Sequence, residues 1–63
     1  MQKNARGYVQ DSVSALSNAK ENLQNALGTV ERETNRTDIE QTLKTVESAL
    51  EQCSQTANVL EQV

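Results

Sequence analysis

The sequence predicts an all-α fold, an antiparallel hairpin of two helices over residues of about 6–34 and 38–62 that dimerises into a four-helix bundle. Apolar residues recur at alternating steps of four and three in both halves of the chain. The two halves are out of phase across a polar segment centred on Asn35. With 63 residues, the chain is one domain, residues 1–63, and is too small to cover both helices from all sides.

The alternating steps have the heptad spacing of helices packed side by side. We call the fourteen residues at these positions the seam, and place Val9 and Ile39 at heptad position d. Thirteen seam residues are apolar, and Lys20 is the exception. The seam consists of Val9, Val13, Leu16, Lys20, Leu23, Leu27 and Val30, followed by Ile39, Leu43, Val46, Leu50, Cys53, Ala57 and Leu60.

Two further rows accompany the seam. The g positions hold only small residues, and we call them the small-residue edge: Ser12, Ala19, Ala26, Thr42, Ala49 and Thr56. The f positions, opposite the seam, are all polar, so each helix has an outward polar back. From residue 12 to residue 30 the only charges are Lys20 and Glu21, which is compatible with a surface that contacts another helix or subunit.

The first helix has several possible start signals. Asn4, Gly7 and Asp11 are each able to cap it. Tyr8 and Val9 lie beside or on the seam, which favours a start between Asn4 and Gly7. Gly28 is expected inside this helix, where glycine costs about 1 kcal/mol relative to alanine.

The break between the helices is predicted at Thr34–Asp38. Asn35 tolerates the left-handed conformation that ends a helix. Thr37 and Glu40 have the spacing of a capping box, and Asp38 adds negative charge at the start of the second helix. The alternative is one continuous helix with a stutter, because no proline enforces a stop.

Folding the chain antiparallel about Asn35 aligns the seam in seven layers without a gap. The largest side chains fall near the turn, and the thinnest layer falls near the open end. The layers are Val30/Ile39, Leu27/Leu43, Leu23/Val46, Lys20/Leu50, Leu16/Cys53, Val13/Ala57 and Val9/Leu60.

Such a hairpin needs further support. Small chains gain it from disulfides, a metal or association. A single cysteine forms no disulfide within the chain, and without histidine no His/Cys zinc site forms. Association remains, most simply as a two-fold homodimer.

Composition argues against an enzyme. The chain has no histidine, only two glycines and one cysteine, so His-based triads, Cys–His pairs and glycine-rich phosphate loops are excluded. We expect no cofactor and no metal. Acidic residues cluster at the predicted turn, but they lack the residue order of a calcium loop. No apolar run is long enough for a membrane span or a signal peptide.

Three single residues have competing interpretations. Lys20 either extends its ammonium from the seam to water or fixes the register of assembly, with Glu47 and Glu51 as expected partners. Cys53 is expected to be a small buried apolar residue rather than a redox sensor. Tyr8 either packs over the end of the bundle or contacts a partner.

These features favour a cytoplasmic, non-enzymatic protein-interaction or regulatory module that acts through helix packing. The expected partner is a second copy, and another protein docking on the small-residue edge is the other possibility. A nucleic-acid-binding helical-bundle dimer is the alternative function, disfavoured by a net charge of -3 and scattered basic residues. The candidate interface residues are Val9, Val13, Leu16, Lys20, Leu23, Leu27, Leu43, Leu50, Cys53, Ala57 and Leu60, with Ala19, Ala26 and Ala49.

Overall fold

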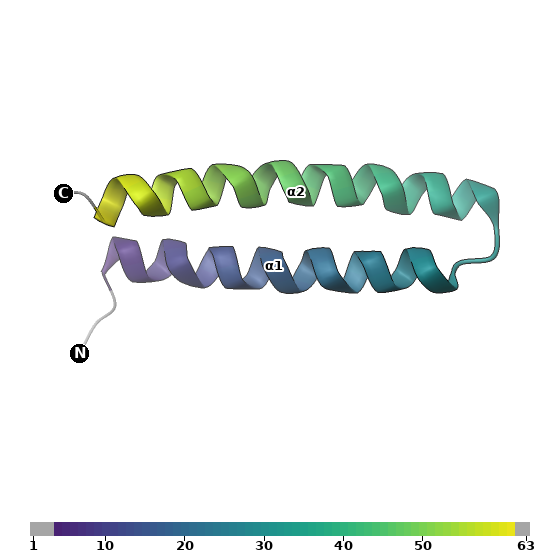
Figure 1. Cartoon of the computed structure of the whole chain (residues 1–63), viewed down its shortest axis with the longest axis horizontal. Helices are drawn as coiled ribbons and strands as arrows, with labels where there is room; N and C mark the ends of the chain where they lie inside the picture. The colour runs from purple at the N-terminus through teal and green to yellow at the C-terminus, as the bar shows by residue number, and fades with distance from the viewer. Residues whose placement is uncertain (1–3, 62–63) are drawn as a thin grey trace.

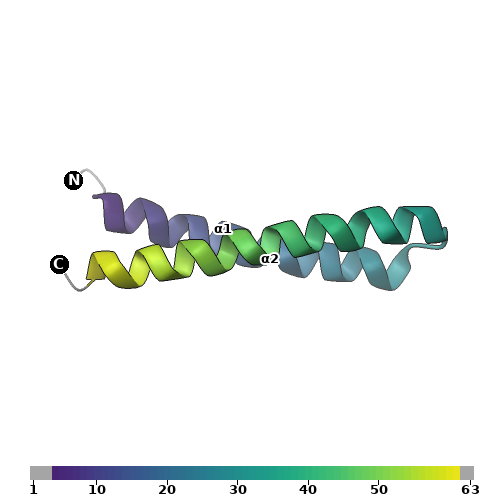
Figure 2. The same ribbon diagram turned by 90° about the horizontal axis from the view of Figure 1, so that it is seen from above.

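The computed structural model describes residues 4–61 and contains two α-helices, α1 (Ala5–Thr29) and α2 (Glu33–Glu61). The helices lie antiparallel and side by side, with the start of α1 and the end of α2 at the same end of the molecule (Figure 1). Seen from above, they cross at a shallow angle near their middles (Figure 2). The predicted helical hairpin is therefore confirmed.

The start of α1 is set by Asn4. Its side-chain Oδ1 accepts a hydrogen bond from the Gly7 backbone N–H at 2.8 Å, and its backbone is extended. The Asn4 carbonyl accepts the first helical bond, from the Tyr8 N–H at 3.1 Å. Asn4 thus satisfies one of the N–H groups that a helix start leaves without an intrahelical partner.

The turn lies at residues 30–32, and the predicted position at Thr34–Asp38 is wrong. Residues 34–38 belong to α2, which starts at Glu33 instead of residue 38. Asn35 is not left-handed, since no residue of the described range has a positive φ. The Thr37 hydroxyl donates to the Glu33 carbonyl at 3.2 Å, so Thr37 is bonded as a helix-interior residue and the predicted capping box does not form.

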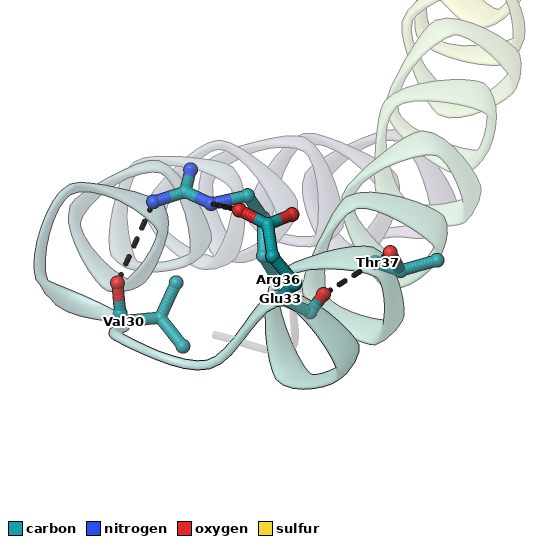
Figure 3. A network of polar contacts seen from close by, with 4 residues as sticks. All are labelled: Val30, Glu33, Arg36 and Thr37. Atoms are coloured by element: carbon teal, nitrogen blue, oxygen red, sulfur yellow. Dashed lines mark hydrogen bonds and ion pairs between the residues drawn. The ribbon is translucent and has the colours of Figure 1, made fainter.

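Val30 and Arg36 close this turn (Figure 3). Val30 takes an extended backbone, while its N–H still donates to the Ala26 carbonyl at 2.9 Å. The Arg36 guanidinium donates to the Val30 carbonyl at 3.4 Å and lies 4.0 Å from the Glu33 carboxylate. The Glu33 charge also suits the positive end of the α2 dipole. One side chain therefore joins the end of α1 to the first turn of α2.

Gly28 lies inside α1, as the sequence indicated, although the helix ends one residue later. A methyl group built at this position meets no atom within 4 Å. Neither a close approach nor a left-handed backbone requires glycine there.

We expect Asn4→Ala to lower the free energy of unfolding by about 1 kcal/mol, because the mutant leaves the Gly7 N–H without its side-chain acceptor. Asn4→Asp is the matched control, since it keeps the acceptor and adds a negative charge at the helix start. Urea denaturation followed by circular dichroism measures both variants. Equal stability of the alanine variant and the unmodified chain would contradict this role of Asn4.

Candidate interface

The seam lies along the contact between α1 and α2. Every seam residue is half-buried or buried, and Ala57, at 8% exposure, is the one buried residue of the described range. The leucine, isoleucine and valine residues of the seam all remain partly exposed to water. The hairpin alone therefore does not enclose the seam.

Lys20 and Gln10 each make a polar contact that crosses from α1 to α2. The Lys20 ammonium lies 3.6 Å from the Glu47 carboxylate. Near the open end, the Gln10 side-chain amide donates to the Glu61 carboxylate at 3.1 Å. The Lys20–Glu47 contact lies three positions along α2 from the predicted register, in which Lys20 is level with Leu50, because the turn lies at residues 30–32 rather than at Asn35.

The two flanks of the seam differ in chemistry. Both acceptors, Glu47 and Glu61, occupy heptad position e, and so does Gln10. We call the e positions within the helices the polar edge: Gln10, Ser17, Gln24, Glu40, Glu47, Ser54 and Glu61. The small-residue edge lies on the other flank, because e and g positions border the seam on opposite sides.

The small-residue edge is partly covered. Ala19, Ala26 and Ala49 are half-buried, whereas Ser12, Thr42 and Thr56 are exposed. The three alanines thus widen the apolar surface of the seam toward this flank, near the middle of the hairpin. Near the open end, the small-residue edge consists of Ser12 and Thr56 instead of alanines.

A hollow of about 410 Å³ lies on this flank near the open end. Its walls come from both helices: Val9, Ser12, Gln52, Cys53, Gln55 and Thr56. Positions c, d and g of α2 are neighbours around the helix, which places the hollow on the small-residue side. The small side chains of Ser12 and Thr56 explain why the surface is recessed there.

Lys20 and Cys53 occupy the seam in different ways. The Lys20 side chain is 36% exposed and that of Glu47 is 44% exposed, so their ion pair is hydrated. Its contribution to stability is accordingly small, about 0–1 kcal/mol. Cys53 is a half-buried free thiol in the wall of the hollow. Tyr8 is 62% exposed in the hairpin.

Sequence reasoning missed Arg36, which is half-buried and occupies heptad position a, one heptad before Leu43. The heptad phase of the second half, extended backwards from Ile39, was the signal that identifies it. The Gln10–Glu61 contact and the hollow were missed as well, since both depend on the register and on side-chain size.

Chemistry-bearing clusters are scarce in the part of the chain that the structure describes. No three acidic or cysteine side chains between residues 4 and 61 gather as metal ligands. Neither α1 nor α2 holds an apolar stretch suited to crossing a bilayer. Comparison with models of protein families, with curated proteins and with solved structures finds no match to this chain.

We expect Lys20→Leu to raise the free energy of unfolding by about 1 kcal/mol, because a leucine buries apolar surface in the seam while the lost ion pair is hydrated. Glu47→Gln, which removes only the charge of the partner, should lower it by less than about 0.5 kcal/mol. Urea denaturation measures both. A Lys20→Leu variant less stable than the unmodified chain would show that the ion pair contributes more than its exposure implies.

Proposed function

We propose that this chain is a non-enzymatic protein-interaction module whose seam and small-residue edge pack against helices of another subunit. The simplest such subunit is a second copy, which gives a homodimeric four-helix bundle. One observation carries the proposal: within residues 4–61 only Ala57 is buried, although thirteen seam residues are apolar. A second layer of helices would remove the remaining apolar surface of the seam from water.

The dimensions of the hairpin support the same conclusion. Its accessible surface is 4946 Å², compared with about 4,000 Å² for a compact monomer of its mass. Its radius of gyration is 14.6 Å, compared with about 10.6 Å for a compact domain of this length. The hairpin therefore exposes more surface than a domain that folds around its own core.

Residue types support a non-enzymatic role. Histidine is missing, and the Cys53 thiol lies beside serine, threonine and glutamine side chains rather than a general base. Nucleophilic catalysis by a thiol needs an adjacent base or a cation that stabilises the thiolate. A reducing cytoplasm suits a chain with a single free thiol, and we propose that compartment.

Nucleic-acid binding has weaker support. Arg6 lies at the open end of a molecule 46 Å long, whereas Arg32 and Arg36 lie at the turn. The Arg36 guanidinium contacts Val30 and Glu33, so it is held within the turn. Within residues 4–61, Arg6 is therefore far from Arg32 and Arg36, and these three groups form no compact patch that matches a phosphate backbone.

We expect sedimentation equilibrium at micromolar concentration to give twice the chain mass of 7.0 kDa. Ala19→Glu and Ala26→Glu place a charge on the half-buried small-residue edge and should weaken dimerisation at least tenfold, or by about 1.4 kcal/mol. Asn18→Glu and Asn25→Glu are matched controls, because they add the same charge to the exposed back of α1 and should leave the dimer intact.

Circular dichroism of the same samples reports whether each variant keeps its helices. A cooperatively folded monomer at micromolar concentration contradicts the dimer. Dimerisation that is unaffected by both alanine variants contradicts the assignment of the interface to this edge.

A further inference from the structure

We propose that the two hairpins of the dimer pack with their turns at opposite ends, so that the hollow near the open end of each copy receives apolar side chains from the turn end of the other. This inference rests on the proposed dimer and adds its topology. The competing topology places both turns at the same end. Three observations distinguish the two: the location of the hollow, the gradient of side-chain size and the distribution of charge.

The hollow indicates which face of the hairpin the second copy covers and which end of that face is left unfilled. It lies on the small-residue side, between Ser12 of α1 and Thr56 of α2. The opposite flank is bridged by the Gln10–Glu61 and Lys20–Glu47 contacts. A second copy that packs on the small-residue side therefore covers the half-exposed seam without breaking either bridge.

Side-chain size changes along the seam. The turn half contains Leu23, Leu27, Ile39 and Leu43, whereas the open half contains the smaller Val13, Cys53 and Ala57. Stacking two hairpins with both turns at one end would place the larger side chains of both copies together at one end and the smaller ones together at the other. That arrangement leaves the hollows of both copies next to each other, and unfilled space lowers stability.

Reversing one copy evens out the side-chain sizes. With the two-fold axis near the middle of the hairpin, Leu27 and Leu43 in the turn half of one copy lie toward Val13 and Ala57 in the open half of the other. Large side chains then face small ones toward both ends of the dimer, which is how close-packed interiors fill their volume.

Small side chains at the centre of the small-residue edge allow the two hairpins to approach each other closely. Ala19 and Ala49 lie near the middles of α1 and α2 and are half-buried. Small residues at a crossing point permit close contact of helix axes. The Lys20 ammonium is drawn to Glu47 on the polar edge, which lies away from the face that the second copy covers.

Charge favours the same topology. Residues 31–40 carry four carboxylates, from Glu31, Glu33, Asp38 and Glu40, and two guanidinium groups, from Arg32 and Arg36. Turns at the same end would place two such net-negative segments together. Turns at opposite ends separate them.

The broad face of the hairpin is large enough to hold an interface of ordinary size. It measures 46 Å by 21 Å, so complete coverage of this face on both copies gives an upper bound of about 1,900 Å² in total, within the range of stable interfaces.

Distance measurement between spin labels tests the topology. The background variant is Cys53→Ala, which removes the native thiol; Cys53→Val replaces it if circular dichroism shows loss of helix. A label on Glu31→Cys marks the exposed turn. We expect a distance between the two labels close to the 46 Å length of the hairpin. Turns at the same end would give about 20 Å, or two interaxial spacings.

A label on Asn18→Cys, on the exposed back of α1 near its middle, is the control. It should give a distance under about 30 Å in either topology and so reports dimerisation alone. A control signal with a short Glu31 distance, or with both distances, overturns the topology and leaves the dimer standing. Loss of the signal at both positions overturns the proposed dimer and the topology with it.

Discussion

Two helices packed side by side shield each other's apolar stripes over only part of their circumference. In this chain the stripe follows most of both helices, and its residues stay partly exposed from Val9 to Leu60, apart from the buried Ala57. The remaining features of the molecule follow from this geometry. Polar residues occupy one flank of the seam and small residues the other, so the two flanks are suited to different surroundings: water on the polar edge and a second helical layer on the small-residue edge.

Polar contacts hold the hairpin together where the apolar contact is thin. Gln10 and Glu61 join the helices at the open end, and Arg36 joins α2 to Val30, the first residue of the turn. Lys20 and Glu47 join the two helices at the middle of the seam. These contacts are exposed or half-buried, and each contributes little to stability. Their effect is to favour one register, which presents a defined face to a second subunit.

The seam could be predicted from the sequence because heptad periodicity depends only on which residues avoid water. The turn could not be located in the same way. Thr37 and Asn35 have capping propensities, but the Thr37 hydroxyl bonds back to the preceding helical turn, as threonines within helices do. Val30 leaves the helix as an extended residue, and Arg36 fixes that geometry from six residues away. The hollow also escaped prediction, because it depends on the relative size of Ser12 and Thr56 across the two helices.

Thermal unfolding at two protein concentrations tests most directly whether the hairpin is half of a larger fold. If folding is coupled to dimerisation, mass action makes the midpoint depend on concentration. For a dimer of this size, a rise from about 5 to about 500 µM should increase Tm by about 10 °C. A Tm that is the same at both concentrations would contradict the account, since it would show that the two helices are stable without a second copy.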